Sequence, residues 1–176
     1  MDTTDKRRYE FDWALLGDLD LGRPTMGSMM RVEAYRLMQS SFRDVLEQKL
    51  GTEGTDAFFY EAGELAGRAL YKNMFTEVTT LAQFVERLTD VLQNLRIGIL
   101  MIEKADPDAG VFVMTVSEDL DCSGLPVLDF PICSYDEGLI AALMESFTGD
   151  KFVVREVDCW CTGARTCRFS AERVVA

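Results

Sequence analysis

The chain has 176 residues, of which 48% are hydrophobic and 27% are charged, a composition typical of a globular protein with one well-buried core. Thirty acidic residues against eighteen Lys and Arg give a formal net charge of −12. Such a surface repels phosphate backbones, so we expect no nucleic-acid partner. The amino terminus has no apolar signal segment and no run reaches the length of a membrane span, so we expect a cytoplasmic protein without a membrane segment.

The amino-terminal part of the chain is expected to form an arm. Residues 9–16 begin with a period-two alternation that predicts a strand or an extended arm, and residues 17–27 follow as a loop. We take residues 1–27 as an N-terminal arm and possible dimerisation segment. Residues 28–176 are then expected to form a single ligand-binding domain.

Three helices are predicted next. The first runs from about Ser28 and ends at Gly51, and the second starts from a cap at Thr55 or Asp56 and runs to about residue 75. Gly63 and Gly67 are four residues apart in the second helix, and each costs roughly 1 kcal/mol of helix propensity. A neighbouring structure is therefore expected to approach that face closely, a helix being favoured over a ligand. A third helix is expected to open at Thr79 or Thr80.

The pattern then changes to strands. Residues 97–102 and 111–116 are apolar runs rich in β-branched residues and are joined by a Pro-, Asp- and Gly-containing connection, which predicts a hairpin. A loop over 117–131 leads to a fourth helix, capped by Ser134 and stopped at Gly149. Two more strands are expected over 152–157 and 168–175. The order predicts an α+β fold, with helices packed on one side of an antiparallel sheet and a zinc-bound C-terminal hairpin.

The chain has five cysteines and no histidine. In a reducing cytoplasm such cysteines are free thiols or metal ligands, and their odd number argues against a complete disulfide framework. For Cys122 the interpretation as a small buried hydrophobic residue stays open. The other cysteines gather in the last third of the chain, where a different interpretation applies.

Cys133, Glu156, Cys159 and Cys167 form the candidate metal site. Cys133 lies just before the fourth helix, Glu156 and Cys159 end one strand, and Cys167 begins the next. Thiolates gathered at a glycine-containing turn predict a tetrahedral zinc ion. Cys161 competes with Glu156 for a place in the shell, and an iron–sulfur cluster is the alternative. Four protein ligands close the shell, which favours a structural over a catalytic role.

Residues 154–169, which read VREVDCWCTGARTCRF, resemble the signature of the 4-vinyl reductase domain family. The EAGELAG segment at 61–67, and residues 22–24 leading towards 35–37, are similar to that family too, so the resemblance covers about residue 18 to the end. In that family, and in the similar sensor domains of aromatic-responsive transcription activators, zinc is held by Cys, Glu, Cys and Cys. Their spacing matches that of Cys133, Glu156, Cys159 and Cys167.

The resemblance implies a zinc-containing domain, usually dimeric, that holds a small molecule between helices and sheet. The phenol-type sensors use a pocket histidine, which this chain lacks, so phenol recognition is not implied. The chain shows no ATPase or DNA-binding domain, so we expect a signal to leave through a separate partner protein. The aromatic and flexible residues expected nearest the gap between helices and sheet are Phe84, Leu88, Phe112, Met114 and Phe130.

The leading hypothesis is a homodimeric sensor or binding domain for a small hydrophobic or aromatic molecule, acting through a partner protein. The absence of histidine and of a nucleophile–base pair gives hydrolytic catalysis little support. One alternative is an enzyme or accessory factor in reduction of a tetrapyrrole vinyl group, which would need an electron source. Another is a redox sensor that uses Cys159 and Cys161.

Overall fold

The computed structural model describes residues 8–175 and divides the chain into two compact units, the first ending at Arg31 and the second beginning at Val32. The described part of the first unit holds a 3₁₀ turn, η1 (Trp13–Leu16), and a single-turn helix, α1 (Leu19–Gly22). The strand expected within residues 9–16 is wrong, because the Asp12 side chain accepts the N–H of Ala14 and starts a helical turn instead. Residues 1–7 of the predicted arm lie outside the described residues, and the dimerisation role of residues 1–27 stays a prediction.

The second unit begins with the long helix α2 (Val32–Met74), which breaks at Gly51. Gly51 has φ 69° and ψ 176°, a conformation that glycine adopts readily. The predicted helix end at Gly51 is therefore confirmed, and α2 consists of two segments, residues 32–50 and 52–74. Helix α3 (Leu81–Asn94) opens as predicted at Thr80, whose hydroxyl accepts the N–H of Gln83 in a capping box.

Four strands form one antiparallel sheet in the order β1-β2-β4-β3. The strands are β1 (Ile99–Asp106), β2 (Val111–Ser117), β3 (Phe152–Asp158) and β4 (Cys167–Arg173), and a 3₁₀ turn, η2 (Trp160–Thr162), lies between β3 and β4. Both predicted hairpins are confirmed. Because β4 pairs with β2 as well as with β3, the carboxy-terminal hairpin is part of the main sheet.

Helix α4 (Ser134–Thr148) connects the two hairpins. Its capping position is Cys133, so the predicted cap at Ser134 is wrong; the Ser134 hydroxyl donates instead to Asp56, 3.2 Å away. The helix ends at Gly149 in the left-handed conformation, as expected.

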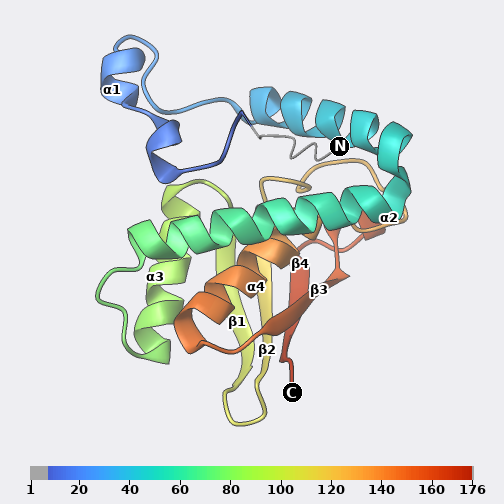
Figure 1. Cartoon of the computed structure of the whole chain (residues 1–176). Helices are drawn as coiled ribbons and strands as arrows, with labels where there is room; N and C mark the ends of the chain where they lie inside the picture. Colours follow the sequence, from blue (N-terminus) through green and yellow to red (C-terminus); the bar gives the residue numbers. More distant parts are fainter. Residues whose placement is uncertain (1–7, 176) are drawn as a thin grey trace, which may run out of the picture. The chain divides into compact units, whose positions relative to one another are not determined.

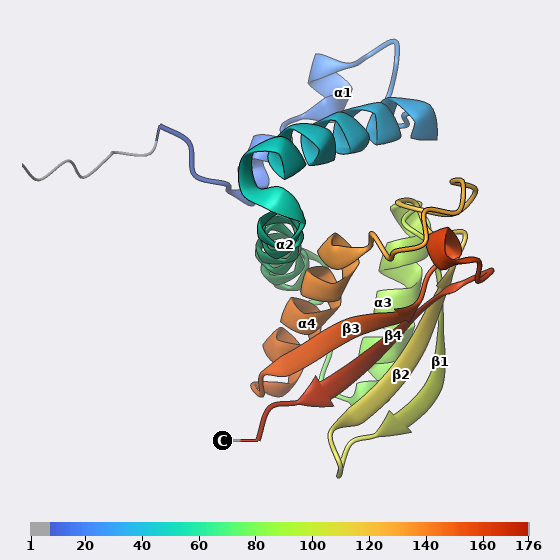
Figure 2. The ribbon, with the colours of Figure 1, turned by 90° about the vertical axis from the view of Figure 1, so that its right-hand side faces the viewer.

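The helices cover one face of the sheet, which confirms the predicted α+β architecture (Figures 1 and 2). Helix α4 packs on β3, α3 packs on β1, and α2 packs against α4. Alternate residues of β2 and β4 are buried beneath these helices, including Phe112, Met114 and Phe169. This core fixes the position of α4 and of the hairpin that follows it.

The contact between α2 and α4 depends on glycines in both helices. A Cβ at Gly63 would collide with the carbonyl oxygen of Tyr135, and one at Gly138 would collide with that of Tyr60. A Cβ at Gly67 would lie 2.6 Å from the carbonyl oxygen of Leu139. The prediction that a neighbouring helix approaches the glycine face of α2 is confirmed.

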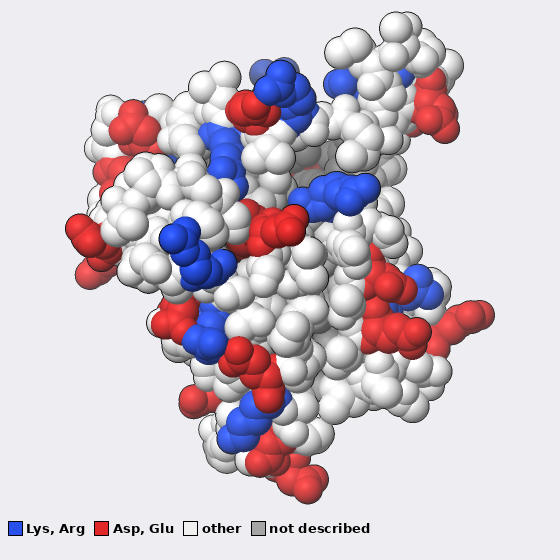
Figure 3. Space-filling view, turned by 180° about the vertical axis from the view of Figure 1, so that it is seen from behind, with Lys and Arg blue, Asp and Glu red and all other residues white. Residues whose placement is uncertain are grey.

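Acidic and basic side chains are interspersed on the face shown in Figure 3, where Lys and Arg form no continuous patch among the described residues. None of the helices within residues 8–175 combines the length and the apolar character needed to span a bilayer.

Candidate metal centre

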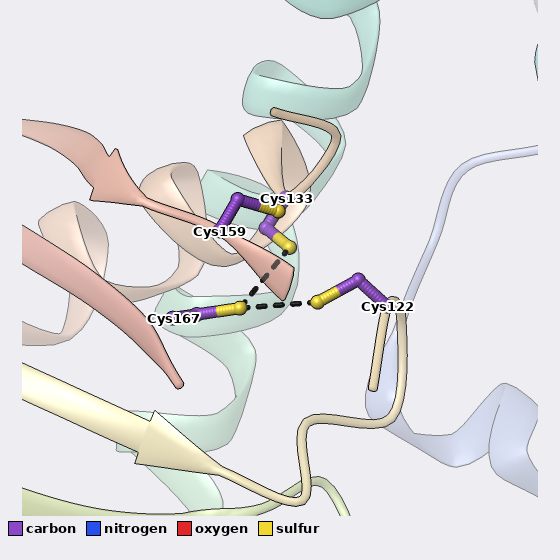
Figure 4. Close-up of side chains that lie close together, drawn as sticks. All are labelled: Cys122, Cys133, Cys159 and Cys167. Carbon is purple, nitrogen blue, oxygen red and sulfur yellow. Dashed lines mark hydrogen bonds between the residues drawn. The ribbon is translucent and has the colours of Figure 1, made fainter. Parts of the chain in front are cut away.

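Four cysteine side chains from separate parts of the chain converge at one end of the sheet (Figure 4). Cys122 comes from the loop after β2, Cys133 precedes α4, Cys159 follows β3, and Cys167 begins β4. All four are buried, with at most 1% of each exposed. The last two strands, the loop after β2 and the start of α4 therefore each deliver one sulfur to the same point.

The four Sγ atoms all lie within 4.8 Å of one another. The Cys133 and Cys167 sulfurs are 3.9 Å apart, and those of Cys122 and Cys167 are 3.0 Å apart, longer than the roughly 2.05 Å of a disulfide. Zn–S bonds of about 2.3 Å place the sulfurs of a tetrahedral site about 3.8 Å apart. The donor set and its spacing thus fit one thiophilic metal ion.

Hydrogen bonds hold the Cys122 loop against the carboxy-terminal hairpin. The carbonyl oxygen of Cys161 accepts the N–H groups of Leu128 and Asp129 at 2.8 and 3.2 Å, and the Trp160 indole donates to the carbonyl of Leu125 at 2.9 Å. Because these bonds anchor the loop, the position of the Cys122 sulfur depends on the hairpin as well as on its own neighbours.

A second group of contacts fixes the start of the same loop. Arg36, in the first segment of α2, donates to the carbonyl oxygens of Leu120 and Ser123 at 2.8 and 2.9 Å. Asp119 Oδ1 accepts the N–H groups of Asp121 and Cys122 at 2.9 and 3.0 Å, which forms a tight turn. Residues far apart in the sequence therefore cooperate to present Cys122.

Charge is distributed unevenly among the four thiols. Hydrogen bonds from Cys122, Cys133 and Cys167 lower the pKa of Cys159 far below its ordinary value, whereas contacts with Cys122 and Cys159 raise the pKa of Cys133. The cluster therefore favours a thiolate at Cys159 and protons on its neighbours. A metal cation would release those protons, because metal-bound cysteines are deprotonated.

Glu156 lies beside the four sulfurs. Its Oε2 accepts the backbone N–H of Cys133 at 3.2 Å, while its buried Oε1 has no hydrogen-bond partner. Burial, together with the negative charge of Cys159, raises the pKa of Glu156 to about 8. The carboxylate is thus available as a metal ligand, and its predicted role as the fourth ligand stays a prediction.

The structure separates Cys161 from the other cysteines. Its side chain is buried, but its sulfur is not among the four that lie within 4.8 Å of one another. Burial raises the pKa of Cys161 to about 12, so its thiol stays protonated at neutral pH. Cys122 takes the place in the cluster for which the sequence offered Cys161.

Four of the five predicted pocket residues are brought together. Phe84, Leu88, Phe112 and Met114 line an apolar void of about 20 Å³ between the helices and the sheet, with Met144 on its border. Phe130 lies apart from them in the loop before α4 and is 47% exposed. The void is about the size of one water molecule, so a larger ligand must displace side chains.

Several residues around the centre were missed by sequence reasoning. Cys122 was left open as a core residue, and Asp119 and Asp136 received no role, although both are buried beside the sulfurs. The sequence offered one signal, three acidic or thiol side chains in the short run Asp119–Cys122. Nothing in its spacing identified the partners of that run.

These observations define an α+β domain with a buried thiol centre where its carboxy-terminal hairpin meets the start of a helix. Residues 112–173 match the sequence model of the 4-vinyl reductase domain, so the resemblance to that family is confirmed over this part of the chain. An uncharacterized protein of Methanocaldococcus jannaschii is 22% identical over 149 residues, which cover 85% of this chain and 81% of that protein.

Two solved structures share the fold. A vinyl-4-reductase family protein from Methanocaldococcus jannaschii aligns with a TM-score of 0.59 and 19% identity over 85% of each chain. The phenol-responsive sensory domain of the transcription activator PoxR, solved with phenol, aligns with a TM-score of 0.65 and 18% identity, covering 83% of this chain and 76% of that one. One of these neighbours is thus a small-molecule sensing domain.

Proposed function

We propose that this chain is a zinc-containing sensor domain that binds a small hydrophobic or aromatic molecule and signals through a partner protein. The observation that carries the proposal is the convergence of four buried sulfurs on the start of α4, the helix whose Met144 and Phe147 also border the apolar void. Ligand pocket and metal centre therefore share one helix. A ligand that shifts α4 would change the geometry of the metal-bound end of the domain.

The donor set supports a single zinc ion. Four protein ligands close a tetrahedral shell, which is typical of structural zinc sites. A multi-iron cluster needs room between its cysteines for several irons and sulfides, whereas sulfurs within 4.8 Å of one another leave room for one ion. The zinc would tie the Cys122 loop and the carboxy-terminal hairpin to α4.

The pocket is proposed to open when it is occupied. Phe84 stacks on Phe147 with ring centroids 4.6 Å apart, and Met114 and Met144 supply flexible side chains. Typical ligand pockets have roughly 300 Å³ or more, so a ligand must separate these rings and methionines. The likeness to a phenol-responsive domain supports an aromatic ligand, although the histidine expected for phenol is absent from this sequence.

A thermal-shift screen of phenols, aromatic hydrocarbons and fatty acids tests this proposal. A compound present at about 100 times its Kd should stabilise the fold by about 2.7 kcal/mol, which raises Tm by roughly 5–10 °C. Leu88→Phe fills the void and should abolish that shift. Leu95→Phe makes the same change at a side chain that is 43% exposed and should preserve it. If no compound class raises the Tm of the natural chain, the sensor proposal fails.

We also propose that the domain is a homodimer through the first segment of α2. Met38, Phe42 and Val45 lie on one side of residues 32–50 and are 49%, 58% and 47% exposed. Their spacing places them on successive turns. A second copy of the same face would cover them in an isologous contact, the arrangement expected from the sequence.

Phe42→Glu is expected to convert the dimer to a monomer, because it places a charge in the apolar contact. Light scattering coupled to size exclusion should then give the mass of one chain, 19.8 kDa, in place of twice that value. Ser40→Glu adds the same charge at an exposed position on the other side of the helix and should leave the dimer intact. A monomeric natural chain at micromolar concentration would contradict the proposal.

A further inference from the structure

Three buried carboxylates lie next to the cysteine centre and take no part in it. Asp119, Asp121 and Asp136 are only 1%, 4% and 6% exposed. The first two belong to the loop that carries Cys122, and the third lies in the first turn of α4. Carboxylates are rarely buried to this extent without a compensating positive charge or proton.

Each of these carboxylates has an oxygen without a hydrogen-bond partner. Asp121 Oδ1 accepts the Tyr35 hydroxyl at 2.7 Å, and Asp119 Oδ1 accepts the two backbone N–H groups of its own turn. In contrast, Oδ2 of Asp119, of Asp121 and of Asp136 is fully buried and unpaired. Most buried polar atoms in folded proteins have a partner, so three unpaired oxygens in one place indicate a missing one.

The basic side chain beside this group is committed to other acceptors. The positive charge of Arg36 acts on Asp121, but the Arg36 guanidinium donates its hydrogen bonds to the carbonyl oxygens of Leu120 and Ser123. Arginine therefore supplies no donor to the three unpaired oxygens. Their charge is left to be balanced by protons or by an ion.

Cys133 connects the carboxylates to the cysteine centre. Its Sγ and one carboxylate oxygen from each of Asp119 and Asp136 lie within 4.8 Å of one another. The same Sγ belongs to the group of four sulfurs, and it is 4.0 Å from Asp119 Oδ1. Two potential ligand groups thus share a single thiolate, and a thiolate has enough lone pairs to bind two metal ions.

We propose that this chain binds a second divalent cation through Asp119, Asp136 and a bridging Cys133 thiolate, which makes the centre a two-metal site. One divalent ion among four thiolates leaves an excess of two negative charges beside two more carboxylates. A second divalent ion offsets that charge where the unpaired oxygens lie. With three protein ligands, the second ion keeps a coordination position for water or a small ligand.

The structure also provides a route for the ion. A surface cavity of about 300 Å³ is bordered by Asp119 together with Arg36, Arg96, Glu118 and Ser123. An ion that enters there reaches Asp119 without crossing the apolar core. The rival arrangement is a proton shared between Asp119 and Asp136, which would satisfy the carboxylates without metal.

Metal stoichiometry separates these arrangements. The natural chain, dialysed against excess Zn²⁺ or Co²⁺ and desalted, should contain two ions. Asp136→Asn keeps the shape of the side chain but removes its charge, and should contain one ion with the cobalt–thiolate absorption of the four-cysteine site retained. Asp129→Asn makes the same change at an exposed position of the same loop and should still contain two.

The possible results lead to different conclusions. One ion in the natural chain and one in Asp136→Asn would overturn the second site, indicate a shared proton, and leave the cysteine site standing. No ion in either would overturn the cysteine site as well. If Asp136→Asn loses the cobalt–thiolate absorption together with both ions, the second site is overturned, because the carboxylates then only support the cysteine site. Circular dichroism of each variant confirms that it is folded.

Discussion

Cys159→Ala is expected to lose the metal ion of the cysteine centre and to destabilise the fold by about 4 kcal/mol or more, because that ion links distant segments of the chain. Cys159 carries the most acidic thiol of the cluster and belongs to every ligand set considered. The metal content of the purified variant, together with its urea unfolding curve, measures both effects.

Cys161→Ala is the matched control for that experiment. It deletes an equally buried sulfur from the same hairpin, but one outside the group of four. The variant should keep its metal and lose only the packing of one small side chain, about 1 kcal/mol. Metal retained in Cys159→Ala, or lost equally in both variants, would contradict the assignment of the centre.

The fourth ligand can be determined in the same series. Cys122 Sγ is one of the four clustered sulfurs, whereas Glu156 Oε2 is engaged by the N–H of Cys133. We therefore expect Cys122→Ser to weaken metal binding more than Glu156→Gln does. The reverse order would restore the Cys, Glu, Cys, Cys set implied by the family resemblance.

Gly63→Ala is expected to destabilise the fold by about 3 kcal/mol or more, although alanine gains roughly 1 kcal/mol of helix propensity over glycine. The new methyl group would meet the carbonyl oxygen of Tyr135 and the amide nitrogen of Leu139, and backbone atoms cannot move aside as a flexible side chain can. Because Tyr135 is two residues from Cys133, metal affinity should fall as well. Urea unfolding and a competition assay with a chelator provide the two measurements.

Gly22→Ala is the control for this second prediction. Gly22 ends the short helix α1, and a Cβ there would have nothing within 4 Å. The substitution should change the free energy of unfolding by no more than about 0.5 kcal/mol. If Gly63→Ala leaves the unfolding midpoint unchanged or raises it, the close approach of α2 and α4 does not limit the fold.

Much of the fold could be predicted because its signals are local. The caps and stops at Thr80, Gly51 and Gly149 depend on a few neighbouring residues, and the Pro-Asp-Gly connection of the first hairpin does too. The glycine pair in α2 also indicated its neighbour, because two missing side chains on one face leave space for a backbone. The strand expected at 9–16 failed because one Asp12 side chain outweighed a short alternation.

The candidate site was predicted only in part. Cys133, Cys159 and Cys167 were found through their chemistry and their spacing around a turn. Cys122 could not be assigned, because its place depends on Arg36 and on bonds to the hairpin from residues far away in the sequence. Asp119 and Asp136 read as surface charges, since a sequence does not reveal which carboxylates a fold will bury.

The wide separation of the clustered cysteines has a consequence for the order of folding. Cys122 and Cys133 are 45 and 34 residues from Cys167, and closing loops of that length is entropically costly before the sheet exists. Only Cys159 and Cys167 are close in sequence, so an unfolded chain offers a metal ion two thiolates at most from one turn. Metal capture must therefore follow docking of α4 on the sheet, and chelators should accelerate unfolding far more than they slow folding.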